Sequence, residues 1–192
     1  MAIYYFDINS GDDTTGVGSI GNPYKTFSKA NTVLTAGDIG YFRSGTWISD
    51  PIIPANSGTS SNYITYKAYP GETVILDGAS IASPAKAVDI NTAKQYIEVN
   101  GFEIQDWNGP AVEVGTNATA NNGVRLLNLT IHDINIADQP AIILYSLSDV
   151  LIDNCVIYNI GYVFGSYSST GVGIKGRVTQ NISNITVSKC DI

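Results

Sequence analysis

Ile97-Glu98-Val99-Asn100-Gly101-Phe102-Glu103-Ile104 is the first of four similar blocks in this chain. The others are Val124-Arg125-Leu126-Leu127-Asn128-Leu129-Thr130-Ile131, Val150-Leu151-Ile152-Asp153-Asn154-Cys155-Val156-Ile157 and Ile185-Thr186-Val187-Ser188-Lys189-Cys190-Asp191-Ile192. When Gly101, Asn128, Asn154 and Lys189 are aligned, the blocks recur at spacings of 27, 26 and 35 residues. A recurring period of this length marks a repeat protein, in which each unit buries its apolar face against its neighbours. Because apolar and polar residues alternate within each block, the repeating unit consists of strands rather than helices.

Each repeat contains three strand segments, so we expect coils whose equivalent strands stack on one another. The first set comprises residues 97–99, 124–126, 150–152 and 185–187, the second 102–104, 129–131, 155–157 and 190–192, and the third 87–90, 111–114, 141–144 and 171–174. Asn128 and Asn154 share the corner between the first two sets. Stacked amides of this kind form ladders, so we expect a short one here.

The composition fits one β-rich domain and argues against two classes of partner. At 192 residues and 44% hydrophobic content, the chain is long enough for one continuous core. Its net charge is −7 and its ten Lys and Arg residues form no basic stripe, so we expect neither nucleic acid nor an anionic membrane surface as a partner. The sequence has no run of the ~20 apolar residues that a transmembrane helix needs, and it does not begin with a signal-type segment. We therefore expect a protein made without a classical export signal.

The two cysteines, Cys155 and Cys190, occupy the same position in successive repeats. Parallel strands lie ~4.8 Å apart, so the two side chains should stack with nearly parallel Cβ vectors, which is poor geometry for a disulfide. We therefore expect two buried free thiols that act as small hydrophobic side chains.

The first 47 residues differ from the repeats. Residues 26–34 have the apolar spacing of a short helix that ends before Gly37. A short amphipathic helix at this point would cover the open end of a solenoid core. We therefore divide one domain into an N-terminal cap, residues 1–47, and coils of strands, residues 48–192.

Several short stretches of the first 80 residues resemble a known family. They are Asn22-Pro23-Tyr24-Lys25-Thr26-Phe27-Ser28-Lys29-Ala30, Ala36-Gly37-Asp38, Phe42-Arg43-Ser44-Gly45-Thr46-Trp47, Tyr63-Ile64-Thr65-Tyr66-Lys67-Ala68-Tyr69-Pro70-Gly71-Glu72 and Val74-Ile75-Leu76-Asp77-Gly78. This opening resembles the N-terminal segment of right-handed parallel β-helix proteins, a superfamily of pectate-lyase-like, polysaccharide-active and phage tail-spike-like proteins. The resemblance implies an all-β fold, a single right-handed parallel β-helix (a β-solenoid) with a short N-terminal capping helix. No stretch matches a catalytic motif of the superfamily, so it assigns no catalytic residue.

The last repeat stops inside its second strand, at Asp191-Ile192, and the C-terminal coil has no capping element. An open coil exposes unpaired backbone groups and apolar side chains. We therefore expect either a longer native protein or a partner chain at this end, such as a homo-oligomer, for which a trimer is plausible, or other virion proteins.

Apolar residues fill the inward positions of the coils, so a functional site must use the outward columns. Four outward columns carry polar or aromatic groups: Glu98-Arg125-Leu151-Thr186, Gln105-His132-Tyr158, Gly115-Tyr145-Lys175 and the turn column Asp106-Asp133-Asn159.

His132, the only histidine, is a candidate general base flanked by Arg125 and Asp133. The alternative is a non-catalytic histidine at an exposed strand position. Polysaccharide lyases of the superfamily typically use a Lys or Arg base together with Ca²⁺ or another cation. The resemblance therefore makes Arg125, Lys175 and Arg177 further candidates for catalysis.

Asp106 and Asp133 should lie about one strand spacing apart, close enough to be candidate ligands of Ca²⁺. The alternative is that each side chain bonds to its own backbone in an Asx-type turn, as Asn159 would in the next coil. We favour the turn, because the third member of the column is an amide.

The long spacing between the last two blocks contains an aromatic loop, residues 161–170, rich in Gly and Ser. Its Tyr162 and Tyr167, with Tyr145 and Tyr158 on nearby outward columns, are candidate substrate-binding residues. Aromatic rings present apolar faces to sugar C–H groups while their hydroxyls form hydrogen bonds. The alternative is that these rings pack over the sheet or meet a neighbouring subunit.

Three hypotheses for function remain open. The first is a carbohydrate-binding β-helix protein of a virion appendage or surface, such as a phage tail spike, fibre or decoration protein, that binds a polysaccharide or cell-surface glycan. The second is the N-terminal part of a secreted, extracellular polysaccharide lyase or hydrolase. The third is a non-catalytic structural shaft or decoration protein. Without a catalytic motif, the sequence favours binding over catalysis for this segment.

Overall fold

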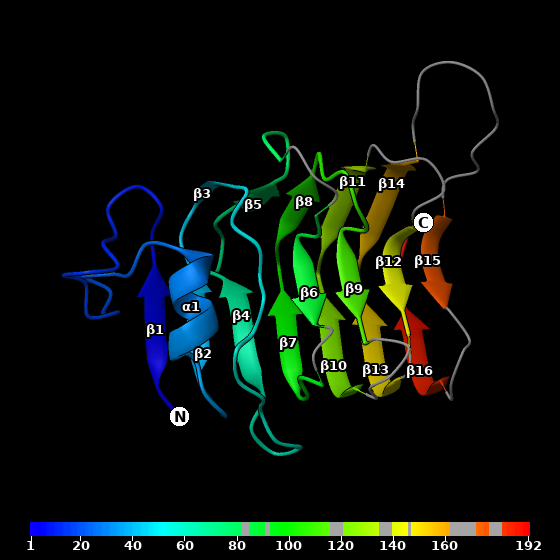
Figure 1. The fold of residues 1–192 in the computed structure, drawn as a ribbon, viewed down its shortest axis with the longest axis horizontal. Helices are drawn as coiled ribbons and strands as arrows, with labels where there is room; N and C mark the ends of the chain where they lie inside the picture. The colour runs from blue at the N-terminus through cyan, green and yellow to red at the C-terminus, as the bar shows by residue number, and fades with distance from the viewer. Residues whose placement is uncertain are drawn as a thin grey trace.

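The chain winds into coils, and the strands of successive coils stack into three parallel sheets (Figure 1). The structure is a computed structural model that describes residues 1–81, 85–90, 93–115, 121–134, 140–145, 147–161, 172–176 and 182–192. The N-terminus and the C-terminal coil lie towards opposite ends of the long axis (Figure 1). The predicted parallel β-helix is confirmed.

Each strand pairs in parallel with the equivalent strand of a neighbouring coil, and the strands inside each sheet pair on both sides. The seven-stranded sheet comprises, in order, β1 (Ile3–Phe6), β2 (Ile39–Phe42), β4 (Ile64–Ala68), β7 (Ile97–Asn100), β10 (Asn121–Leu127), β13 (Leu147–Asp153) and β16 (Ile182–Ser188). The five-stranded sheet comprises β3 (Gly45–Ile48), β5 (Val74–Asp77), β8 (Glu103–Gln105), β11 (Thr130–Ile134) and β14 (Val156–Ile160). The four-stranded sheet comprises β6 (Val88–Ile90), β9 (Val112–Val114), β12 (Pro140–Leu144) and β15 (Val172–Gly176).

The register of the first strand set agrees with the repeat alignment. Val124 lies opposite both Ile97 and Val150, and Val150 lies opposite Ile185. Inward residues of the inner coils, such as Val99 and Leu126, are fully buried in one apolar core, whereas Val187 of the last coil is 46% exposed. Alternation along each strand therefore separates a packed interior from a polar exterior.

The predicted helix is α1 (Phe27–Val33), which lies at the N-terminal end, drawn beside β1 and in front of β2 (Figure 1). Thr26 caps it by accepting a hydrogen bond from the backbone N–H of Lys29, and Phe27 packs its ring 4.0 Å from that of Phe42 on β2. Among the described residues, no helix is long and apolar enough to cross a membrane. The domain boundary at residue 47 stays a prediction.

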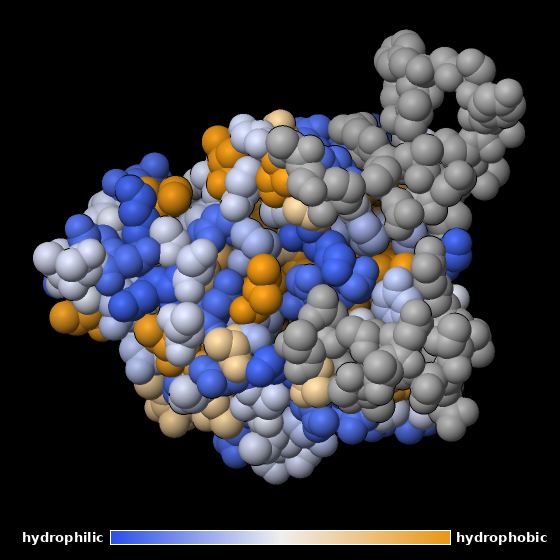
Figure 2. All heavy atoms as spheres, viewed as in Figure 1, coloured by the Kyte–Doolittle hydropathy of each residue, from blue (hydrophilic) through white to orange (hydrophobic). Residues whose placement is uncertain are grey.

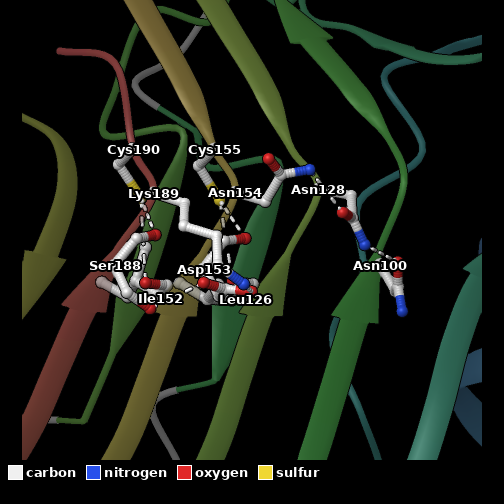
Figure 3. A network of polar contacts seen from close by, with 10 residues as sticks. All are labelled: Asn100, Leu126, Asn128, Ile152, Asp153, Asn154, Cys155, Ser188, Lys189 and Cys190. Atoms are coloured by element: carbon white, nitrogen blue, oxygen red, sulfur yellow. Dashed lines mark hydrogen bonds and ion pairs between the residues drawn. The ribbon is translucent and has the colours of Figure 1, made fainter.

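The corner between the seven-stranded and five-stranded sheets is built on left-handed residues. Gly101, Asn128, Asn154 and Lys189 all have positive φ angles, of 83°, 53°, 55° and 52°. Glycine and asparagine adopt this conformation most readily, which explains why they recur here. The Asn128 amide donates to Asn100 Oδ1 and accepts from Asn154 Nδ2, both at 2.8 Å (Figure 3). The predicted amide ladder is confirmed and is one residue longer than expected.

Both cysteines are free, as predicted, and they lie side by side at this corner (Figure 3). Cys155 is buried, whereas Cys190 is only partly buried. Burial raises the pKa of the Cys155 thiol to about 11, so this thiol stays protonated and behaves as a small apolar side chain.

Candidate functional site

The outer surface of the coils carries the ionisable groups. On the face seen in Figure 2, hydrophilic residues of the described part of the chain are interspersed with small hydrophobic groups. Outward side chains form separate clusters, and two of these clusters contain residues that the sequence singles out. These are the histidine cluster on the five-stranded sheet and the arginine pocket on the seven-stranded sheet.

The histidine cluster is centred on His132 of β11. Its Nδ1 lies 2.7 Å from Asp133 Oδ2, and its Nε2 lies 3.2 Å from Glu103 Oε1 on β8. The Tyr158 ring of β14 stacks on the imidazole at 4.9 Å with an interplanar angle of 3°. His132 therefore ties three successive coils together.

The environment of His132 differs from the prediction in two respects. The residue is buried, with 10% of its side chain exposed, because the carboxylates and the Tyr158 ring cover an outward position. Arg125 does not flank it, since Arg125 belongs to β10 in the seven-stranded sheet and pairs with Glu98. Both nitrogens of the imidazole contact carboxylates, which suits a structural imidazolium better than a general base.

Burial lowers the pKa of His132, but the hydrogen bonds and charges of Asp133 and Glu103 outweigh it, so the pKa is raised above its ordinary value. A raised folded-state pKa gives stability that is fully present below the unfolded-state pKa of about 6.5 and is lost as the pH rises through the folded-state value. His132→Gln should therefore cost about 1 kcal/mol at mildly acidic pH, because solvent screens the partly exposed carboxylates, and less at alkaline pH. Urea unfolding of both proteins across this range measures the difference. A difference that does not vary with pH would contradict the assignment of a charged His132.

The turn column after this sheet is left-handed, with φ angles of 57° at Asp106, 53° at Asp133 and 51° at Asn159. Asp133 accepts a hydrogen bond from Asn159 Nδ2 at 3.3 Å and also contacts His132. Among the described residues, no group of three or more His, Cys, Asp or Glu side chains could hold a metal ion. The Ca²⁺ site at Asp106 and Asp133 stays a prediction.

The arginine pocket lies on the outer face of the seven-stranded sheet. Arg125 of β10 lies opposite Glu98 of β7 and Leu151 of β13, as the predicted column requires. Glu98 in turn lies opposite Thr65 of β4, which the prediction did not include. The Arg125 guanidinium lies 3.9 Å from the centre of the Tyr63 ring and 3.4 Å from Glu98 Oε2. These residues line a shallow pocket of ≈ 230 Å³ together with Ser61 and Asn62 and with Met1, Gly37 and Ile39. The pocket combines a cation, an aromatic ring and polar side chains on one exposed surface.

Lys175 does not stand in the predicted column. It lies opposite Ile143 of β12, and Ile143 lies opposite Glu113 of β9, so the column of Lys175 is two residues away from Tyr145. Glu113 instead pairs with Lys86, whose Nζ lies 2.7 Å from Glu113 Oε1. Tyr145 itself is half-buried at the end of β12.

Sequence reasoning missed the aromatic and acidic partners of its candidates. It did not link Tyr63 to Arg125 or Glu103 to His132, and it singled out neither member of the ion pair between Lys86 and Glu113. The register of β8 and β11 could have pointed to Glu103, because this residue lies one outward position away from His132 along the neighbouring strand.

Three of the predicted site residues, Tyr162, Tyr167 and Arg177, lie outside the described residues. Tyr158 of β14, another predicted substrate-binding residue, is 45% exposed. One face of its ring is covered by the stacked imidazole of His132.

Comparisons with known proteins agree with the fold. A family model described as the Pel9A-like, right handed beta helix region matches residues 5–135. Pectate lyase PEL9 of Emericella nidulans is 31% identical over 103 residues, which covers 53% of this chain and 24% of that protein. The chain thus spans about a quarter of the length of this curated relative.

Two solved structures share the fold at low sequence identity. A GH136 lacto-N-biosidase from Eubacterium ramulus has a TM-score of 0.68 and 18% identity, covering 82% of this chain and 34% of its own. A rhamnogalacturonan lyase has a TM-score of 0.66 and 18% identity, covering 99% of this chain and 56% of its own. The family match covers more than half of the chain and confirms the predicted handedness. The chain therefore belongs to the family of Pel9A-like right-handed β-helix regions.

Proposed function

We propose that this chain is the β-helix segment of an extracellular enzyme that binds and depolymerises an acidic polysaccharide, acting as a lyase. The observation that carries the proposal is the family match over residues 5–135, together with a relative named as a pectate lyase. Polysaccharides are too large to cross a membrane, which supports a place of action outside the cell.

The geometry is compatible with this function. The interior is filled by apolar side chains, so a long polymer can only lie along the outside of the solenoid. The outer columns repeat at the ~4.8 Å spacing of parallel strands and carry tyrosines beside cations, such as Arg125 with Tyr63 and Arg43 with Tyr69. Arginine side chains can pair with the carboxylates of uronates, and the apolar faces of aromatic rings can contact sugar rings.

The comparisons favour an enzyme of polysaccharides over the virion appendage predicted first. The similar proteins reported above are lyases and a glycosidase. Roles on a virion and in an oligomer stay predictions.

The proposal is tested with the full chain, polygalacturonate and rhamnogalacturonan, with neutral galactan as a control. A lyase removes the C5 proton of a uronate and breaks the C4–oxygen bond, which leaves a C4–C5 double bond and frees the departing sugar with a hydroxyl group. We expect retarded migration in gels that contain the acidic polymers and a rise in the ultraviolet absorbance of the unsaturated uronate. New reducing ends without that absorbance would contradict lyase chemistry. Absence of both retardation and cleavage would overturn the proposed function.

A further inference from the structure

We infer that the arginine pocket is a subsite for one carboxylate-bearing sugar unit of a polysaccharide, with Arg125 as the residue that recognises the carboxylate. The inference rests on the proposed function and names a binding position for it.

The first observation is that Arg125 is held loosely. Its Nη1 lies 3.4 Å from Glu98 Oε2, and 43% of its side chain is exposed. Charge-assisted hydrogen bonds are normally ≈ 2.7–2.9 Å long, so the ion pair with Glu98 is a long one. The guanidinium is held mainly by its planar face, which lies 3.9 Å from the centre of the Tyr63 ring and leaves its N–H edges available. A guanidinium has five N–H donors, and two of them can form parallel hydrogen bonds to the two oxygens of one carboxylate, a bidentate pair.

Arg43, which directly follows β2 of the same sheet, shows the contrasting arrangement. Its Nη2 lies 2.7 Å from Glu72 Oε1, and its Nε donates to both carboxylate oxygens at 2.9 and 3.0 Å. This ion pair is closed on itself. Arg125 has the same kind of partner but lacks this bidentate pairing, so it can turn its N–H donors towards an incoming carboxylate.

The second observation is that the tyrosine rings beside Arg125 are closely packed against the backbone. Tyr63 and Tyr96 meet edge to face at 5.7 Å, and both pack over Gly123. A Cβ at Gly123 would lie 2.3 Å from the Tyr96 ring and 2.9 Å from the Tyr63 hydroxyl, and its φ of 63° also favours glycine. The rings therefore have a set position, and Tyr63 presents its face to Arg125.

The third observation is the size and chemistry of the pocket itself. Its volume of ≈ 230 Å³ lies below the ≈ 300–1,000 Å³ of pockets for drug-sized ligands, which suits a single sugar unit. Ser61, Asn62 and Thr65 line it with hydroxyl and amide groups that can bond sugar hydroxyls. A uronate would thus place its carboxylate on Arg125 and its hydroxyls on this polar rim.

The test is the affinity of the full chain for an oligosaccharide of galacturonate and for the matched galactose oligosaccharide, measured by calorimetry. We expect Arg125→Gln to weaken galacturonate binding by about 10-fold to 100-fold and to leave galactose binding within about twofold. Glu98→Gln should strengthen galacturonate binding a few-fold, because it removes the carboxylate that competes for Arg125. Lys29→Gln is the control, since it removes the same charge from a cation that lies 4.9 Å from the Tyr24 ring on the capping helix. It should bind as the wild type does.

The outcomes separate this subsite from the proposed function. If the wild type binds galacturonate and Arg125→Gln binds it equally well, the subsite is wrong and the function stands. Equal weakening of acidic and neutral oligosaccharides by Arg125→Gln would also overturn carboxylate recognition. Thermal unfolding of each variant identifies a folding defect, in which case Arg125→Lys decides: it keeps the charge but loses the paired N–H donors, and unchanged affinity would rule out bidentate recognition. A wild type that binds no acidic polysaccharide overturns both proposals.

Discussion

Phe42→Ala should lower the free energy of unfolding by about 3–5 kcal/mol, because it empties the centre of the N-terminal core. Phe42 is fully buried. Its ring stacks on Phe27 of α1 at 4.0 Å and on Phe6 of β1 at 4.7 Å, and meets Trp47 of β3 edge to face at 5.9 Å. One substitution therefore removes the contacts that join the helix to the first strands of two sheets. Urea unfolding followed by circular dichroism measures the loss.

Tyr41→Ala is the matched control for this prediction. Tyr41 is the preceding residue of β2 but points outward, where it packs on Tyr5 at 6.0 Å and Tyr69 at 5.6 Å and stays partly exposed. Its loss should cost about 1 kcal/mol, the value of exposed aromatic pairs rather than of a cavity. Similar costs for the two substitutions would mean that the helix does not depend on the aromatic core.

The fold could be predicted because several independent patterns in the sequence agree. Alternation in the four blocks fixes which residues of the strands face inward, since a slip of one residue would expose all of them. Gly101, Asn128 and Asn154 mark the same left-handed corner in successive coils, which fixes where one strand ends and the next begins. The spacing of apolar residues such as Phe27 and Ala30, ending before Gly37, indicated the helix.

The wrong position of Lys175 follows from the limits of the same pattern. A shift of two residues keeps every side chain on the same face, so hydrophobic alternation cannot detect it. The third strand set has no corner residue of the Asn128 type that the alignment could use. The prediction therefore placed Lys175 on the correct face of the sheet but in the wrong pairing register. It lies opposite Ile143 and not opposite Tyr145.

The candidate site was only partly predictable, because a column of outward residues does not say which of them touch. Tyr63 and Arg125 are 62 positions apart in the sequence, and Tyr63 lies just before β4 rather than within a repeat block. The burial of His132 has a similar cause. Large neighbours along the stack can cover an outward position, and here Tyr158 and Glu103 cover His132.

Asn128→Ala should lower the free energy of unfolding by about 2–3 kcal/mol, the second largest effect we expect. Alanine at a φ of 53° pays the cost of a left-handed conformation, about 1–2 kcal/mol, and it also loses the amide bonds to Asn100 and Asn154. The amide of Asn128 is exposed, so each of these bonds contributes at the low end of its usual range.

Asn128→Gly separates the two causes, because glycine adopts the left-handed conformation without strain yet forms no amide bond. We expect it to cost about 1 kcal/mol, less than alanine at the same position. Gly101, the equivalent residue of the preceding coil, already shows that glycine fits this corner, with a φ of 83°. If glycine and alanine destabilised the protein equally, the conformation of the corner would contribute nothing and the ladder alone would explain Asn128. If glycine had no effect, the stacked amides would be a consequence of the coil geometry and not one of its causes.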